Sequence, residues 1–291
     1  MINSQMKSNK IGACCQNLYA QFLYRILMVK REFNLTNCHI ALFSPTLFLT
    51  GSSYTKFRKV FLNEFSFDNA IQFKANHFAD VADNWGISFS LWHNGISENK
   101  NDFEYTLVDN IEGEVVNVGK KIVYNIDNKF SASDWIKDII SGEKVEFVNL
   151  SNAISIKEKN TKWNKNSFGY IYTDGSNNVD KNTQGVSLFS APFSNAHGVS
   201  ILPDNFDRCT ALFSARKLIE KNWVNSKDEY IAPNTEHSTY NEFVNDSLIY
   251  NLFHSASNQS SLRNIDYKGK TWNIKNEFFW LSNKEIESLA N

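Results

Sequence analysis

The sequence has little proline, glycine and cysteine, and almost no net charge. Its 291 residues include 4 prolines, 12 glycines and 4 cysteines, with 30 basic side chains against 31 acidic ones. This balance argues against a strongly cationic nucleic-acid coat but is compatible with a local basic face. Aromatic residues make up 14% of the chain. We therefore expect one large or two modest folded domains rather than disorder.

Motifs that mark several other classes of protein are also missing. No two cysteines have the spacing of a zinc or redox motif, so we expect reduced thiols. The six histidines show no HxxxH or HxH spacing, so we expect no metal site. The N-terminal residues lack the layout of a signal peptide, and no apolar run reaches about 18 residues. These features predict a soluble, cytoplasmic protein without a membrane partner.

The first hundred residues have the pattern of an α/β sheet. We expect a helix, a strand, a helix and two strands, at 15–33, 38–45, 52–65, 68–75 and 86–94. Apolar residues recur with helical spacing in the first helix at Leu18, Phe22, Ile26 and Val29. The run "CHIALFSP" predicts a strand buried on both faces of a parallel sheet. The last two strands are expected to be antiparallel, because their link is too short for a crossover helix.

After Gly95 the pattern changes to short strands, hairpins and amphipathic helices. We expect a short helix capped by Ser131 or Ser133, and longer helices within 207–223 and 239–253. The polar segment 151–166 is expected to be a surface excursion, and a capping box at Ser282 and Glu285 predicts a helix at the C-terminus. We therefore divide the chain into a first region, 1–95, and a second region, 96–291.

Several segments in the first region occur in an informative order. They are "LYAQFLYRIL", "HIALFSPTLFL", "YTKFRKVFLNEF", "FDNAIQF", "KANHFADVADNW" and "GISFSLW". In this order they resemble the second half of the catalytic domain of adenine-specific (N6) DNA methyltransferases of restriction–modification systems. The resemblance implies an α/β fold: the C-terminal half of a Rossmann-like methyltransferase sheet, followed by a mixed α/β target-recognition region.

The resemblance also implies a set of site residues. Enzymes of this family rotate the target adenine out of duplex DNA and hold its ring against aromatic side chains. By position, Phe78 would stack on the flipped adenine as the catalytic-site aromatic, with His77 beside it and Ser44, Pro45 and Thr46 lining the cleft. Such stacking contributes about 1–3 kcal/mol per base. The alternative for Phe78 is an ordinary core position at the end of a strand.

Two motifs of that family are missing from this chain. Binding S-adenosylmethionine calls for a strand, a Gly-rich turn and a carboxylate, and the sequence contains no G-x-G. The catalytic Asn/Asp-Pro-Pro-Tyr motif is also absent, since all four prolines are isolated. The resemblance therefore implies a fragment or split subunit, inactive alone, which depends on a complementary N-terminal methyltransferase chain for its S-adenosylmethionine site.

Two alternatives to this interpretation remain open. One is a non-catalytic module that binds duplex DNA, and the other is a decayed remnant of a restriction–modification gene. Basic side chains that could contact DNA phosphates are Lys56, Arg58, Arg208, Arg216, Lys268 and Lys270. The same side chains also fit ordinary solvated helix faces and turns.

Overall fold

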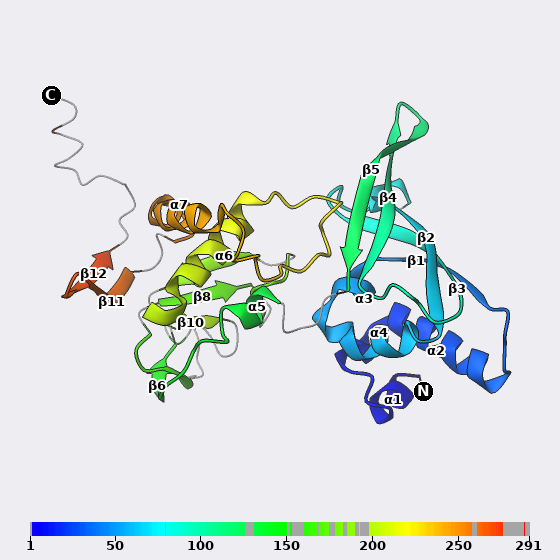
Figure 1. Ribbon diagram of the computed structural model, residues 1–291, viewed down its shortest axis with the longest axis horizontal. Coiled ribbons are helices and arrows are strands. Elements are labelled where there is room, and N and C mark those ends of the chain that lie inside the picture. The colour runs from blue at the N-terminus through cyan, green and yellow to red at the C-terminus, as the bar shows by residue number, and fades with distance from the viewer. Residues whose placement is uncertain are drawn as a thin grey trace. The chain divides into compact units, whose positions relative to one another are not determined.

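The computed structural model describes residues 2–78, 80–125, 131–149, 152, 160–167, 169–174, 178–182, 185–189, 192, 198–257, 261–275 and 288. The chain forms two compact units, coloured along the sequence in Figure 1. Unit 1 comprises Met1–Phe130 and Lys221–Glu229, and unit 2 comprises Ser131–Glu220 and Tyr230–Asn291. The boundary expected at 95/96 thus falls inside unit 1, because the hairpin that follows joins the same sheet as the preceding strands.

The elements of unit 1 alternate between helices and strands at first and end in a long hairpin. They are α1 (Ile2–Ser8), η1 (Ala13–Gln16), α2 (Leu18–Glu32), β1 (His39–Ser44), α3 (Leu47–Thr50), η2 (Ser52–Tyr54), α4 (Thr55–Phe61), β2 (Phe65–Lys74), η3 (Ala75–His77), β3 (Gly86–Asn94), β4 (Asp102–Ile111) and β5 (Glu114–Tyr124). The expected order of a helix, a strand, a helix and two strands is confirmed.

The five strands of unit 1 form one mixed sheet in the order β1-β3-β2-β4-β5. Strand β3 runs antiparallel to both of its neighbours, β1 and β2, so the expected antiparallel pairing of β2 and β3 is confirmed. Strand β4 is parallel to β2, and β5 returns antiparallel to β4. It follows that β1 and β2 point the same way and end at the same side of the sheet.

Strand β1 is an edge strand with only one face buried, so the expectation of a strand buried on both faces was wrong. Ile40 and Ser44 are buried, whereas Ala41 and Phe43 are exposed. Both faces of β1 carry apolar side chains, which explains the continuous apolar run in the sequence. One face packs on the core, and on the other Phe43 lies among further aromatic rings. In the described part of the chain, no strand pairs with the outer edge of β1.

The main core of unit 1 lies between the sheet and helices α1 to α4, which gather on one of its faces (Figure 1). Tyr24, Phe48, Phe61, Phe65 and Trp92 are all less than 2% exposed and form much of this core. Edge-to-face contacts, such as the 5.1 Å between the ring centroids of Phe61 and Trp92, add to the hydrophobic burial. The core therefore fixes the sheet from one side.

Helix α2 does not bury the whole of its apolar stripe. Leu23 and Leu27 are fully buried, whereas Leu18 and Phe22 are 70% and 64% exposed. The helix itself was predicted correctly, but its apolar surface is wider than the area that packs on the rest of unit 1. An apolar stripe is thus left on the outside of α2.

Residues 221–229, which we call the strap, return from unit 2 and complete unit 1. The side-chain amide of Gln72 donates to two carbonyl oxygens of the strap, one of them that of Trp223, at 2.9 Å. The backbone N–H of Gly86 donates to Ser226 Oγ at 3.1 Å. Further hydrogen bonds join the strap to Thr50, Ser52 and Lys121. The strap is therefore an integral part of unit 1.

Unit 2 combines a three-stranded antiparallel sheet, β10-β8-β9, with two hairpins, β6–β7 and β11–β12. Its elements are α5 (Ala132–Trp135), β6 (Lys144–Val148), β7 (Asn160–Asn164), β8 (Gly169–Thr173), β9 (Val186–Phe189), β10 (Val199–Ile201), η6 (Pro203–Asn205), α6 (Phe206–Leu218), α7 (Tyr240–Phe253), β11 (Ser261–Tyr267) and β12 (Lys270–Lys275). Helices α6 and α7 pack over a core that includes Ile171, Leu188 and Phe213. The chain is thus of mixed α/β class.

Several local predictions in unit 2 can be compared with the structure. The two long helices are confirmed as α6 and α7, and Ser131 is the N-cap of α5, accepting a hydrogen bond from the N–H of Asp134 at 3.0 Å. Part of the polar segment 151–166 is strand β7, while much of the rest lies outside the described residues, as does the capping box at Ser282 and Glu285. No helix in the described part of the chain has the length and apolarity of a membrane span.

Candidate functional site

Phe78 is displayed on the surface at the carboxyl end of β2, directly after η3. It is 69% exposed, so the ordinary core position considered for it is wrong. Its ring centroid lies 5.6 Å from that of Phe43 and 5.2 Å from that of Phe73. Phe89 extends the group, with its centroid 4.6 Å from that of Phe43. We call Phe43, Phe73, Phe78 and Phe89 the aromatic patch.

The aromatic patch lies on the face of the sheet that the helices do not cover. Side chains alternate between the two faces of a strand, and Ile40 and Trp92 point into the main core. Phe43 and Phe89 are paired across β1 and β3 and lie at odd offsets from those core residues. They therefore point to the opposite face, where Phe43 is 53% exposed.

An ion-pair group holds the turn that carries Phe78. Lys74 Nζ lies 2.6 Å from Asp109 Oδ2, and His77 Nε2 lies 3.1 Å from Asp109 Oδ1. The hydrogen bond from Lys74 lowers the pKa of the Asp109 carboxyl, and the one from His77 acts in the same direction. Asp109 therefore stays ionised and ties η3 to β4, which positions the neighbouring Phe78.

The three residues expected to line the cleft, Ser44, Pro45 and Thr46, differ in how far they are exposed. Ser44 and Thr46 are 1% and 4% exposed, so they lie beneath the surface, while Pro45 is half-buried. The hydroxyl of Ser88 donates to the carbonyl of Ser44 at 2.7 Å and fixes the end of β1. Of the five residues implied by the resemblance, His77 and Phe78 reach the surface, but Ser44 and Thr46 serve the packing below it.

Arg58 is a structural residue rather than a contact for DNA. It is 1% exposed, and its guanidinium donates to Asn125 Oδ1 at 2.6 Å and to the carbonyl of Phe48 at 3.3 Å. It also donates to the carbonyl of Gly51. Burial lowers the pKa of Arg58 to about 10. Arg58 is thus buried and bonded to groups of unit 1, which argues against the phosphate contact expected from the sequence.

Arg208 and Arg216 are engaged within unit 2. Arg216 is 9% exposed, donates to the carbonyl of Val179 and lies over the ring of Tyr230, 5.2 Å from its centroid. Burial lowers the pKa of Arg216. Arg208 forms an ion pair with Asp138. The geometry therefore argues against phosphate contacts for these two arginines as well.

Three of the basic residues singled out from the sequence are exposed. Lys56 lies on the outer face of α4, Lys268 lies in the turn of the β11–β12 hairpin, and Lys270 begins β12. In the described part of the chain, no carboxylate forms an ion pair with any of them, although Lys268 Nζ lies over the ring of Tyr267. These three remain compatible with a contact to DNA phosphates.

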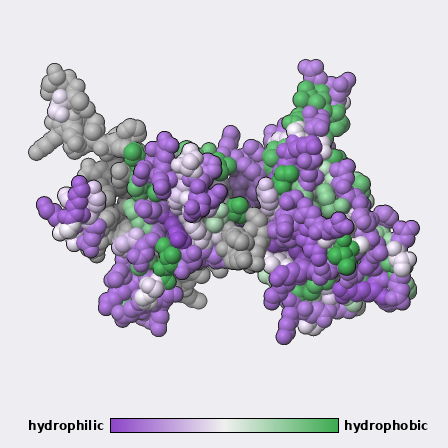
Figure 2. Space-filling view, viewed as in Figure 1, coloured by the Kyte–Doolittle hydropathy of each residue, from purple (hydrophilic) through white to green (hydrophobic). Residues whose placement is uncertain are grey.

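Sequence reasoning missed the exposed apolar side chains on the sheet of unit 1. The alternation of "IALFS" puts Ala41 and Phe43 on one face and Ile40 and Leu42 on the other, but both faces are apolar, so the sequence does not tell which of them is exposed. Figure 2 shows further hydrophobic side chains on the β4–β5 hairpin. They include Ile111, Val115 and Val118, which are 49%, 77% and 45% exposed. Exposed apolar surface of this extent is typical of an interaction site.

The arrangement offers aromatic faces to a planar ring, together with an anchored histidine. Within the described ranges, no three His, Cys, Asp or Glu side chains are grouped so as to hold a metal ion. Comparison with known proteins finds no family model, no curated protein and no solved structure that matches the chain.

Proposed function

We propose that the chain is the C-terminal portion of an adenine-N6 DNA methyltransferase, whose S-adenosylmethionine site is supplied by a complementary N-terminal chain. The observation that carries the proposal is the exposure of Phe78 at the carboxyl end of β2. An aromatic ring that receives a flipped base must be accessible yet held in place. Phe78 has both properties, because its ring packs against those of Phe43 and Phe73 while 69% of the residue is exposed.

The position of Phe78 in the sheet supports the same proposal. Open α/β sheets bind their ligands at the carboxyl ends of parallel strands. β1 and β2 point the same way and are separated by the antiparallel β3. Phe78 follows β2, and Ser44 ends β1. Because β1 and β2 run in the same direction, the turn with Phe78 and the end of β1 lie at the same side of the sheet.

The surfaces around β1 support a complementary chain. An unpaired strand edge presents free N–H and C=O groups and favours association. Beside that edge lies the aromatic patch, where Phe43 is 53% exposed. A chain that contributed further strands next to β1 and helices over the aromatic face would bury the strand edge and the aromatic patch together, with a Gly-rich turn for the cofactor and a Pro-Pro-Tyr motif for catalysis.

The first expected result is that the purified chain alone transfers no labelled methyl group from S-adenosylmethionine to duplex DNA. Transfer is expected on co-expression with a neighbouring gene product that carries a Gly-rich strand–turn–helix and a Pro-Pro-Tyr motif. Transfer by this chain alone would contradict the split arrangement. If no such partner restores transfer, salt-sensitive binding of DNA would favour the non-catalytic DNA-binding module instead. In that module the exposed Lys56, Lys268 and Lys270 would contact DNA phosphates.

The second expected result concerns Phe78→Ala in the reconstituted enzyme. Loss of base stacking is expected to slow methylation roughly 10- to 100-fold. The melting temperature should hardly change, because the side chain is mostly exposed. Phe33→Ala is the matched control, since Phe33 is 63% exposed on the same unit but lies outside the aromatic patch. Equal methylation rates for the two variants would remove Phe78 from the site.

A further inference from the structure

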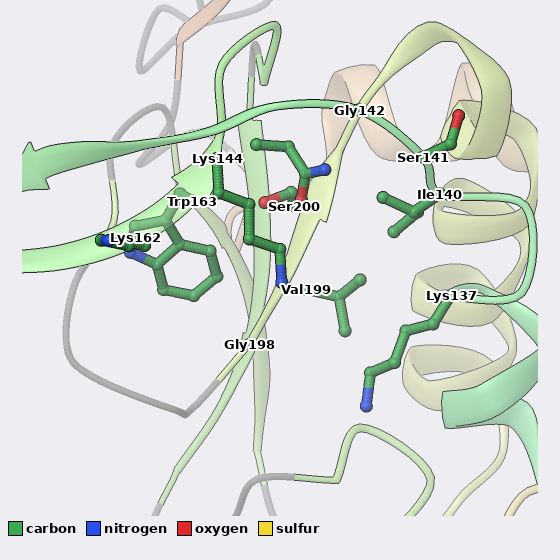
Figure 3. A pocket seen from close by; sticks show the side chains of 11 residues that line it. Lys137, Ile140, Ser141, Gly142, Lys144, Lys162, Trp163, Gly198, Val199 and Ser200 are labelled. Carbon is green, nitrogen blue, oxygen red and sulfur yellow. The ribbon is translucent and has the colours of Figure 1, made fainter.

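Unit 2 contains a pocket of about 370 Å³ that is lined by three lysines (Figure 3). Lys137 follows α5, Lys144 begins β6, and Lys162 lies in β7. The described residues that line the pocket include no carboxylate. The pocket lies wholly within unit 2, so its geometry is set by a single compact body.

The β6–β7 hairpin places two of the lysines on one face. Lys144 pairs with Asn164 across the hairpin, and Lys162 stands two positions before Asn164 in β7. Because side chains alternate, these three residues share a face. Figure 3 shows Lys144 extending between Trp163 and Ile140 toward Val199. The third lysine, Lys137, lies just after α5, and its ammonium donates to Ser133 Oγ at 2.8 Å.

Nearby carboxylates leave most of this positive charge uncompensated. Glu143 forms an ion pair with Lys165, 3.0 Å apart, and Asp138 forms one with Arg208. Glu146 lies opposite Lys162 in the hairpin and offsets part of the charge. Lys144 has no ion-pair partner among the described residues. An anion bound in the pocket would therefore be attracted by the ammonium of Lys144 and by the other two lysines of the lining.

We propose that this pocket binds a phosphoryl group. Lysine ammonium groups are compact point charges that suit phosphate oxygens. Ser200 and Asn164, which are 3% and 6% exposed, add polar side chains to the wall. The phosphoryl group belongs either to the backbone of DNA or to a free phosphate-bearing small molecule, because both present the same chemistry. The inference does not depend on the proposed methyl transfer.

The test compares Lys144→Gln with Lys165→Gln in the full chain. Both changes remove one positive charge from an exposed residue near the same end of the hairpin, but only Lys144 lines the pocket. Binding of a labelled 20-base-pair duplex is followed by fluorescence anisotropy, and binding of inorganic phosphate and adenosine 5′-monophosphate by calorimetry. Lys144→Arg, which keeps the charge, and Lys162→Gln serve as second variants if Lys144→Gln fails to fold by circular dichroism.

If the ligand is a DNA phosphate, Lys144→Gln is expected to weaken duplex binding about ten-fold and to lower the slope of log K against log salt concentration by about one. Lys165→Gln is expected to leave the affinity and the slope nearly unchanged. If the ligand is instead a free phosphate-bearing small molecule, inorganic phosphate or adenosine 5′-monophosphate is expected to bind the unaltered chain saturably. Lys144→Gln is then expected to abolish that binding. Either pattern, with binding retained in Lys144→Arg, supports the phosphoryl site. Equal behaviour of Lys144→Gln and Lys165→Gln with all three probes would overturn it.

Discussion

Replacing Gly86 by alanine is expected to destabilise unit 1 by about 3 kcal/mol or more and to loosen the strap. A Cβ atom at this position would lie 2.0 Å from the carbonyl oxygen of Trp223 and 2.9 Å from Nε2 of Gln72. Both groups belong to the contact that holds the strap, and the nearest atom is backbone. The clash is relieved only if the strap moves away and gives up the hydrogen bonds from Gln72 and Gly86.

Gly95→Ala provides the matched control for this prediction. Gly95 is in the same unit, and a Cβ atom there would meet its nearest neighbour, the side chain of His93, at an ordinary 3.5 Å. Urea unfolding followed by circular dichroism should show a small change for Gly95→Ala and a large loss for Gly86→Ala. Faster proteolysis within 221–229 should accompany the loss. Equal midpoints for the two variants would mean that the strap contributes little to unit 1.

Replacing Arg58 by alanine is expected to cost about 3–5 kcal/mol of unfolding free energy. The guanidinium satisfies the carbonyls of Phe48 and Gly51 and the side chain of Asn125 at a site that is only 1% exposed. Alanine leaves those acceptors buried without this donor and also opens a cavity. Lysine should not rescue the loss, because one ammonium cannot reproduce the planar fork of donors.

Arg25→Ala is the control for Arg58→Ala, since it removes the same side chain from an exposed position on α2. Surface changes of this kind usually alter stability by less than about 0.5 kcal/mol. The two variants are compared by urea unfolding at neutral pH. If Arg58→Ala unfolded at the same urea concentration as Arg25→Ala, Arg58 would return to the group of surface cations that could contact DNA.

The sequence predicts those elements whose patterns are local. Helices α6 and α7 run for about three to four turns without proline or glycine, and Ser131 carries a capping signal that needs only the next three residues. The pairing of β2 with β3 followed from the shortness of their link. In each case the information lies within about 25 residues of the element, which is why these predictions are confirmed.

Features that depend on distant contacts could not be predicted in this way. Arg58 looks like a solvated helix cation in the sequence, but Asn125, 67 positions away, is one of its acceptors. The apolar run of β1 gave no sign of which face the helices cover. For the candidate site, the resemblance singled out His77 and Phe78, and the structure places both at the surface. The resemblance did not reveal that Ser44 and Thr46 lie beneath the surface.

The path of the chain has a consequence for the order in which the protein is made. Unit 1 needs the strap, yet the whole of Ser131–Glu220 is synthesised between Phe130 and the strap. Residues 1–130 therefore leave the ribosome with the amide of Gln72 and the N–H of Gly86 still lacking their partners in the strap. Unit 1 cannot be completed during translation until residue 229 has emerged. A nascent chain stalled before that point holds an unfinished N-terminal unit, which makes it a natural substrate for chaperones.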